Sequence, residues 1–340
     1  LLSLALMRYF QEKGTLTRAL VLVPNLTNKE EWAREIEKHA PSTKFVILSG
    51  QLAKRYAQMI APGPTTVFID TYAGFASTMS TLVRITPKSK GKRVPDHKRI
   101  DELTKWANFI VCDESSAGGL GNRAALTYRI VNKLCRAASN VYLLNGTPFG
   151  RDPTPLWPQM HCVDQGETLG ESLGLFRSVF FDESHNGWAT EWIFNKKKTK
   201  TLHQILRHRS LRYEADEADM PPVVRITKHA RLGEDADAVY KKALKSLRQS
   251  KGKVIELKSE FLRMRQISSG FLGYRDDEDG KAAQFDFKTN PKLEMLLGLL
   301  TSIVDDYKTV VFNEYTYSGS VICKELTKLG INHARIYGGT

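Results

Sequence analysis

The sequence predicts an α/β protein built on parallel β-sheet, and three observations support this fold class. Short apolar runs alternate with amphipathic stretches, which is the pattern of βαβ units in a mostly parallel sheet. One apolar run ends in two adjacent carboxylates, Asp113 and Glu114, and a second ends in the turn sequence Asn-Gly-Thr-Pro at residues 145–148. Both runs are continuous rather than alternating, as expected for strands that helices cover on both faces.

Five strands are expected in the first part of the chain. Each crossover between neighbouring parallel strands is expected to be right-handed, which places helices on both faces of the sheet. The predicted strands are residues 19–23, 44–48, 65–69, 108–113 and 140–144.

The strand 108–113 brings its acids to the C-terminal edge of the sheet, where parallel α/β folds bind their ligands. Asp113 and Glu114 therefore form the Walker B arrangement of a nucleoside triphosphatase. In this arrangement Asp113 would orient Mg²⁺ through a bound water, and Glu114 would polarise the attacking water. A buried strand can also end in an acid that only caps a helix, and these residues alone leave both interpretations open.

The run 141–144 leads into Gly146, Thr147 and Pro148, where Gly permits a tight exit and Pro prevents simple continuation of the strand. Together with the two acids and residues 155–157, this order resembles motifs II and III of superfamily 2 helicases and translocases. The branches it resembles most are the SNF2-related and phage-type DEAD/DEAH box proteins. The resemblance implies that Gly146, Thr147 and Pro148 couple nucleotide chemistry to a nucleic-acid surface.

Further segments follow the order of that family. Residues 18–24 and then 27–30 resemble motif Ia, a strand that leads through a capping box into an amphipathic helix. Residues 65–72 resemble motif Ib, residues 220–222 the linker before the second lobe, and residues 308–313 motif IV. The candidate nucleic-acid contacts that this resemblance implies are Pro24, Asn25, Thr71 and Tyr72.

The sequence also departs from the family pattern. No Gly-x-x-x-x-Gly-Lys-Ser/Thr phosphate loop occurs in the 340 residues, although its backbone N–H groups and Lys would hold the β- and γ-phosphates. Ser116 replaces the His of the common motif II, and Gly118 and Gly119 stand as an insertion. Because the chain also stops before motifs V and VI, it is expected to be an internal fragment with little or no ATP hydrolysis of its own.

The resemblance predicts two RecA-like parallel-sheet lobes, both incomplete, with a helical insertion between them. Residues 1–163 would form the first lobe, residues 164–219 the insertion, and residues 220–340 the start of the second lobe, where a strand at 309–312 begins a second parallel sheet. Residues 84–105 are expected to be a long polar loop. The aromatic residues of the insertion are expected to pack a small core rather than to stack bases.

The balance of charge favours a polyanionic partner. The chain holds 50 Lys and Arg against 37 Asp and Glu, a formal net charge of +13 at pH 7, and such residues gain affinity by displacing counterions from phosphates. Good solubility would account for the charge equally well. The helical region 234–270 places Lys241, Lys245 and Arg248 on one basic face, as a DNA-binding surface or as a solvated helix face.

Composition argues against several other classes. The cysteines at 112, 135, 162 and 323 have no paired spacing, which disfavours a zinc site or a disulfide framework. The longest apolar stretches fall short of the roughly 18 residues of a membrane span. The expected location is the cytoplasm of a bacterial or phage-infected cell, or the nucleus if the protein is eukaryotic.

The predicted function is that of an ATP- and Mg²⁺-dependent translocase or helicase, which acts on nucleic acid, double-stranded DNA above all, by ATP hydrolysis between two lobes. The sequence makes no prediction of the oligomeric state. Two alternatives stay open. One is the motor subunit of a restriction-modification system, and the other is a basic nucleic-acid-binding scaffold that never hydrolyses ATP.

Overall fold

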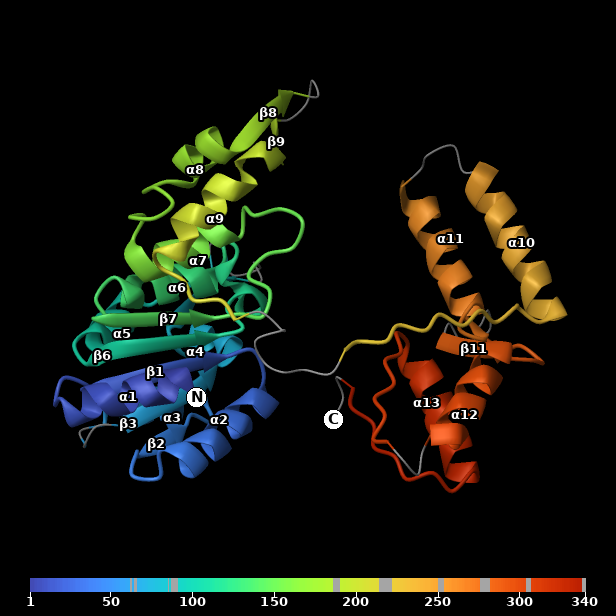
Figure 1. The fold of residues 1–340 in the computed structure, drawn as a ribbon, viewed down its shortest axis with the longest axis horizontal. Helices are drawn as coiled ribbons and strands as arrows, with labels where there is room; N and C mark the ends of the chain where they lie inside the picture. The colour runs from blue at the N-terminus through green and yellow to red at the C-terminus, as the bar shows by residue number, and fades with distance from the viewer. Residues whose placement is uncertain are drawn as a thin grey trace. The chain divides into compact units, whose positions relative to one another are not determined.

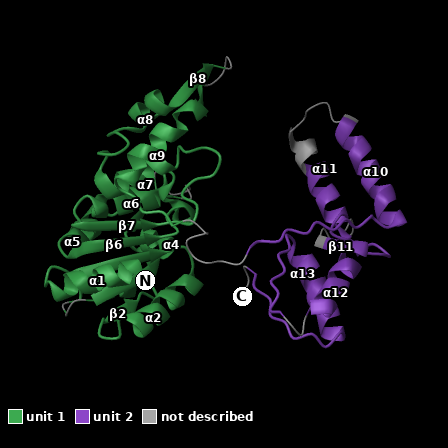
Figure 2. Ribbon diagram, in the orientation of Figure 1, with its two compact units in different colours: residues 1–218 green, residues 219–340 purple. Residues whose placement is uncertain are grey.

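The computed structural model describes residues 1–61, 63, 66–84, 86, 91–185, 190–213, 222–249, 254–275, 282–303 and 307–337. The chain divides into two compact units, Leu1–Ala218 and Asp219–Thr340 (Figures 1 and 2). Each unit has its own hydrophobic cluster of buried side chains and is described separately.

Unit 1 is built around a five-stranded sheet in the order β2-β3-β1-β6-β7. Every pair of neighbouring strands is parallel. The α/β class and all five predicted strands are therefore confirmed, although Thr65 lies outside the described residues. The strands are β1 (Arg18–Val23), β2 (Phe45–Ile47), β3 (Thr66–Thr71), β6 (Ala107–Asp113) and β7 (Asn140–Leu144).

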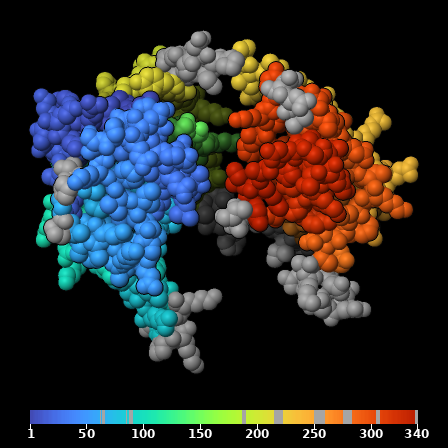
Figure 3. All heavy atoms as spheres, turned by 90° about the horizontal axis from the view of Figure 1, so that it is seen from below, coloured from blue at the N-terminus to red at the C-terminus, as the bar shows by residue number. Residues whose placement is uncertain are grey.

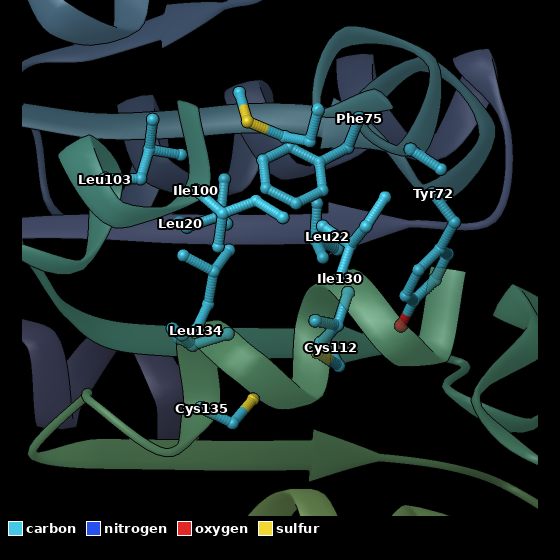
Figure 4. Close-up of a cluster of buried hydrophobic side chains, with 14 of the residues drawn as sticks. Leu20, Leu22, Tyr72, Phe75, Ile100, Leu103, Cys112, Ile130, Leu134 and Cys135 are labelled. Carbon is cyan, nitrogen blue, oxygen red and sulfur yellow. The ribbon is translucent and has the colours of Figure 1, made fainter. Parts of the chain in front are cut away.

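Successive strand residues point to opposite faces of this sheet, and both faces are apolar. Leu22 and Cys112 belong to one buried cluster, whereas Val21 and Val111 belong to the other. Helices α3 (Leu52–Ile60), α4 (Tyr72–Thr78), α5 (His97–Thr104) and α6 (Leu126–Cys135) contribute to the first cluster (Figure 4), and helices α1 (Leu2–Glu12) and α2 (Leu26–His39) to the second. The blue N-terminal elements form much of the unit 1 surface turned toward the viewer in Figure 3. Two apolar faces explain why these strands read as continuous apolar runs.

The prediction of a long polar loop over residues 84–105 is wrong for the part that is described. Strand β4 (Ser80–Val83) pairs antiparallel with β5 (Lys92–Pro95), and helix α5 follows at once. The Asp96 side chain caps α5 by accepting a hydrogen bond from the Arg99 N–H at 3.2 Å. Helix α5 is further held because its apolar side chains Ile100 and Leu103 are fully buried. Lys88 and Lys90 lie outside the described residues.

The segment that follows the sheet combines helices with one β-hairpin. The predicted aromatic packing is confirmed for the described residues, since Phe176, Phe180 and Phe181 share one buried cluster and Trp192 and Phe194 pack against it. Trp188 lies outside the described residues. The hairpin was not expected, because its strands carry charged residues on the exposed side and so lack a long apolar run. The elements are α7 (Leu156–Asp164), α8 (Leu173–Phe180), β8 (Phe181–His185), β9 (Thr190–Phe194) and α9 (Thr199–Arg207).

The described residues of unit 2 form four helices and an antiparallel hairpin. Its elements are α10 (Glu234–Gln249), α11 (Val254–Ile267), β10 (Phe271–Arg275), β11 (Ala282–Asp286), α12 (Pro291–Ile303) and α13 (Thr316–Lys328). The predicted strand at 309–312 is wrong, because residues 307–313 are described and form no strand. Val310 and Phe312 there are 75% and 93% exposed. Met220, Pro221 and residues 338–340 lie outside the described residues.

Across the described parts of both units, no helix combines the length and the apolar character needed to cross a membrane.

Candidate functional site

The candidate site lies at the C-terminal edge of the parallel sheet. In a parallel sheet all strand ends of one kind meet at one edge, so β1, β3, β6 and β7 bring their following residues to the same side. This edge carries residues 24–25 after β1, residues 70–72 at the end of β3, residues 113–114 at the end of β6, and residues 145–148 after β7.

Asp113 is held by two hydrogen bonds from other elements. The indole Nε1–H of Trp32, on α2, donates to Asp113 Oδ2 at 2.8 Å. The hydroxyl of Tyr72, at the start of α4, donates to the main-chain oxygen of Asp113 at 2.9 Å. The second carboxylate oxygen, Oδ1, is not used by either bond. A half-buried carboxylate with one fixed oxygen and one left for a metal-bound water suits the role predicted for Asp113.

Glu114 adopts a backbone conformation that is unusual for its residue type. Its φ is 45°, in the left-handed region that non-glycine residues seldom occupy. Such conformations cost of the order of 1–3 kcal/mol and concentrate at functional sites. The side chain is exposed, and its Oε1 lies 3.9 Å from the position that a Cβ on Gly146 would take. The acid therefore leaves the sheet toward solvent and passes beside the exit of β7.

The exit of β7 is tied to the residues that follow the two acids. Asn145 accepts a hydrogen bond from the Ser116 N–H at 3.0 Å and donates through Nδ2 to Ser115 Oγ at 2.6 Å. Ser116 Oγ donates to the Thr147 carbonyl at 3.3 Å. The serine that replaces the family His thus makes its own link between the acid segment and the Gly-Thr-Pro turn.

Gln159 of α7 adds a second connection between the acid segment and the turn 145–148. It is 1% exposed, and its Oε1 accepts from Ser115 Oγ at 2.8 Å. Its Nε2 donates to the carbonyls of Pro148 and Pro155, each at 2.8 Å. A buried glutamine with all of these bonds fixes the turn 145–148 against the acid segment, because removing its side-chain amide would leave the buried groups that it contacts without this partner.

Thr71 and Tyr72 lie at the predicted edge of the sheet, but their side chains form hydrogen bonds within the protein. Thr71 Oγ1 caps α4 by accepting from the Gly74 N–H at 3.0 Å. Tyr72 is 3% exposed. A nucleic-acid contact at this turn therefore stays a prediction, and it would have to use backbone groups or the exposed Ala73 rather than these two side chains.

Asn25 and Pro24 follow β1 at the same edge, with Asn25 exposed and Pro24 half-buried. Asn25 caps α2, and its Oδ1 accepts from the Asn28 N–H at 3.1 Å. The predicted capping box that begins at Thr27 is wrong, because α2 already begins at Leu26. The capping oxygen sits two residues earlier, where an extended backbone precedes the helix.

Asp70, at the end of β3, is a completely buried carboxylate that the sequence analysis did not single out. Lys29 Nζ donates to its Oδ1 at 3.2 Å, and Arg55 Nη1 lies 3.6 Å from its Oδ2. Burial raises the pKa of Asp70, and the two cations oppose that rise only in part. Breaking such a buried pair costs far more than it adds to stability, so this cluster fixes where β3 meets α2 and α3.

The basic residues predicted for DNA lie on unit 2. Lys241, Lys245 and Arg248 are all exposed on α10, while Ala236 and Ala243 of the same helix are buried. Lys241 also forms an ion pair with Asp237 at 2.6 Å. The three cations therefore share one solvent-facing side of the helix. Whether nucleic acid binds there stays a prediction.

Several residues of the site were missed from the sequence. Trp32 reads as an apolar position of an amphipathic helix, and its indole N–H gives no local signal. Gln159 did offer one, because it interrupts an apolar stretch from Leu156 to Met160 and a buried amide needs partners.

The acids at this edge fit a magnesium ion held mainly by its nucleotide. Mg²⁺ usually keeps several waters and binds one or two carboxylates together with substrate phosphates. Among the described residues no group of three or more His, Cys, Asp or Glu side chains could hold a metal ion. The donor set that Asp113 and Glu114 provide therefore suits this mode and not a protein-only metal cage.

Residues 1–278 match the sequence model of the SNF2-related domain family. Among curated proteins, no sequence matches the chain. A solved structure that it resembles is the Sulfolobus solfataricus SWI2/SNF2 ATPase core in complex with dsDNA, at 19% sequence identity and a TM-score of 0.45. This similarity covers 96% of the chain and 62% of the Sulfolobus chain, so the chain spans less than two thirds of that protein.

Proposed function

The chain belongs to the SNF2-related domain family, and from this premise we propose that it is part of an ATP- and Mg²⁺-dependent motor that moves along double-stranded DNA. One observation carries the proposal. Asp113 and Glu114 leave the C-terminal edge of a parallel sheet beside the turn 145–148, and the two segments are joined by hydrogen bonds.

The geometry supports separate roles for the two acids. Asp113 is fixed by Trp32 and Tyr72, so its remaining carboxylate oxygen is suited to hold a water of the nucleotide's Mg²⁺. Glu114 is exposed to solvent, so it is suited to orient the attacking water. Bound Mg²⁺ would neutralise the charge of the phosphates. Positioning and charge neutralisation account for most of the catalysis of phosphoryl transfer.

Gly146, Thr147 and Pro148 are suited to report on that chemistry. They contact the acid segment through Ser116 and Gln159, so a displacement of Glu114 or of its water would change the position of the turn through these hydrogen bonds. We propose that the turn passes this change on toward the edge formed by residues 24–25 and 71–72. A change of this kind moves an equilibrium only as far as the ligand binds the two arrangements with different affinity.

The direct test is Glu114→Gln in the full-length protein, because the 340 residues contain no phosphate-loop motif. The variant should lose at least a hundredfold in DNA-stimulated ATP turnover and keep its affinity for nucleotide, since an amide cannot act as a base. Glu37→Gln, at an exposed position of α2, is the control and should change neither quantity. Unchanged turnover in Glu114→Gln would remove this residue from the chemistry. A wild-type protein that binds DNA without any ATP turnover would favour the scaffold alternative.

The proposed DNA contact on α10 has its own test. Changing Lys241, Lys245 and Arg248 to Glu should weaken DNA binding and flatten the plot of log affinity against log salt by about one unit for each lost phosphate contact. The matched control changes three exposed lysines elsewhere in unit 2, Lys292, Lys324 and Lys328, to Glu, so that both triple variants have the same net charge. Equal slopes in the two triple variants would show that overall charge, and not α10, accounts for the binding.

A further inference from the structure

Helix α2 reaches the ends of two different strands with two side chains one turn apart. Lys29 Nζ donates to Asp70 Oδ1, at the end of β3, and Trp32 Nε1 donates to Asp113 Oδ2, at the end of β6. Residues three apart on a helix lie on the same face. From one face of α2, these two long side chains therefore reach two strands that are separated in the sheet by β1.

A second connection joins the same two strand ends. Asp70 is followed by Thr71 and Tyr72, and the Thr71 N–H donates to Asp70 Oδ1 at 2.8 Å. The Tyr72 hydroxyl donates to the main-chain oxygen of Asp113 at 2.9 Å. These hydrogen bonds close a ring that runs from Asp113 through Trp32, Lys29, Asp70 and Tyr72 back to Asp113. Two parts of the ring are backbone, since α2 joins Trp32 to Lys29 and residues 70–72 join Asp70 to Tyr72. We call these five residues the acid ring.

Most of the acid ring is shielded from water. Asp70 is fully buried, and Lys29 and Tyr72 are each 3% exposed. Hydrogen bonds are electrostatically stronger in such surroundings, and an unpaired member would be costly, so the ring favours a single arrangement. Burial also raises the pKa of Tyr72, so its phenol keeps the proton that it donates.

Gly118 gives the ring the room that it needs. A Cβ on Gly118 would lie 2.2–2.4 Å from three atoms of the Tyr72 ring. Only a residue without a side chain lets the segment after the acids pass over the tyrosine at this distance. The apparent insertion at Gly118 and Gly119 therefore has a packing role, since it accommodates the residue that holds the Asp113 carbonyl. In Figure 4 Tyr72 lies at one end of the labelled side chains of the buried cluster.

We propose that Trp32 and Tyr72 are positioning residues that hold Asp113 in its working orientation and tie it to the turns after β1 and β3. The inference rests on the proposed function for its catalytic consequence. Trp32 occupies one carboxylate oxygen and so decides which oxygen, Oδ1, is left for the metal-bound water. Tyr72 holds the backbone of the same residue, and it lies in the turn that is predicted to meet nucleic acid. Any displacement of that turn by DNA would therefore reach Asp113 directly.

The ring itself is tested on the 340-residue chain by the indole N–H signals in a ¹H–¹⁵N spectrum. Trp32→Phe identifies the signal of Trp32 by its loss. In Asp113→Asn the Trp32 signal should move upfield and exchange faster with solvent, because a bond to a charged acceptor is about twice as strong as one to a neutral amide. The Trp157 indole, which donates to the Gly170 carbonyl at 2.9 Å, should not move. An unmoved Trp32 signal would overturn the ring.

The positioning role is tested by kinetics on the full-length protein. Trp32→Phe keeps an aromatic ring and loses the N–H, and it should lower kcat about tenfold, which corresponds to about 1.4 kcal/mol. It should also raise the Mg²⁺ concentration for half-maximal rate several-fold and leave the KM for ATP within about threefold. Tyr72→Phe should act in the same direction. A purely structural role would not move the Mg²⁺ dependence.

Matched controls separate the possible failures. Tyr56→Phe and Tyr128→Phe remove hydroxyls that contact Glu102 and His161 instead of Asp113, and both should keep the wild-type kcat and Mg²⁺ dependence. If Glu114→Gln abolishes turnover while Trp32→Phe changes neither quantity, the positioning proposal is wrong and the proposed function stands. If Glu114→Gln has no effect, the proposed function fails, and the indole spectrum still decides on the ring.

Discussion

Two segments of this chain look alike in sequence and differ completely in structure. Residues 108–113 read Asn-Phe-Ile-Val-Cys-Asp, and residues 308–313 read Lys-Thr-Val-Val-Phe-Asn. The first forms β6, in which residues 109–112 are all fully buried. The second forms no strand, and its Val310 and Phe312 are mostly exposed. Apolar, β-branched and aromatic residues in a row are therefore not sufficient to make a strand.

The two segments differ because only the first has neighbouring strands with which to pair. Strand β6 pairs with β1 on one side and β7 on the other, and helices cover both of its faces. Residues 307–313 pair with no strand among the described residues of unit 2. Strand propensity measures how well a side chain packs on a pleated, half-buried surface, so it has little effect where that surface is missing. The contrast predicts very different costs for the same kind of substitution.

The largest effect is expected at the centre of β6. Ile110→Ala removes a fully buried side chain and should lower the free energy of unfolding of unit 1 by about 2–5 kcal/mol. Phe312→Ala removes a larger side chain that is 93% exposed, and its effect should stay within about 0.5 kcal/mol. Hydrogen exchange followed peptide by peptide measures both, since it reports on each unit separately. Equal losses would mean that residues 308–313 are packed in solution after all.

The same reasoning explains what could be predicted from the sequence. The five parallel strands of unit 1 and the position of Asp113 and Glu114 at the end of β6 were predicted correctly, because a continuous apolar run with a polar end is a local signal. The catalytic roles of the two acids stay a prediction. The hydrogen bond between Trp32 and Asp113 joins residues far apart in the chain, and the sequence near either residue gives no sign of it. Such a contact depends on how α2 lies across the sheet, and hydrophobic periodicity fixes the inward face of a helix but not its exact placement.

Two further features of the structure were missed for the same reason. Strand β5 was predicted as part of a loop, because Lys92 and Arg93 obscure a short strand that is stabilised by pairing with β4. Of the nucleic-acid contacts that the resemblance implied, Tyr72 has a buried side chain, which no pattern in the sequence indicates. What the sequence lacked in each case was the identity of the partner segment.

An intermediate effect is expected at Gly118, where a partner also decides the outcome. Gly118→Ala would push a methyl group into the Tyr72 ring, and overpacking of this kind typically costs about 1–3 kcal/mol. Gly146→Ala is the matched change at the neighbouring turn, where the nearest atom to the new methyl is Glu114 Oε1 at 3.9 Å. Its cost should stay near that of a surface substitution. Thermal unfolding of the two variants checks the difference, and a wild-type melting temperature for Gly118→Ala would contradict the close packing of Tyr72.

The smallest effect is expected at the start of α2. The sequence pattern predicted Thr27 as the helix cap, whereas Asn25 caps the helix in the structure. Asn25→Ala removes the oxygen that accepts from the Asn28 N–H and should cost about 1 kcal/mol, as loss of a helix cap usually does. Thr27→Ala, at the position that the sequence pattern suggested, should change the free energy of unfolding by less than about 0.5 kcal/mol, because Thr27 is exposed and already lies within the helix. Chemical denaturation of both variants in parallel measures the difference. A larger loss for Thr27→Ala would move the start of the helix back to the position that the sequence suggested. The opposite order would show that the extended backbone at Asn25, set by the end of β1, determines where α2 begins.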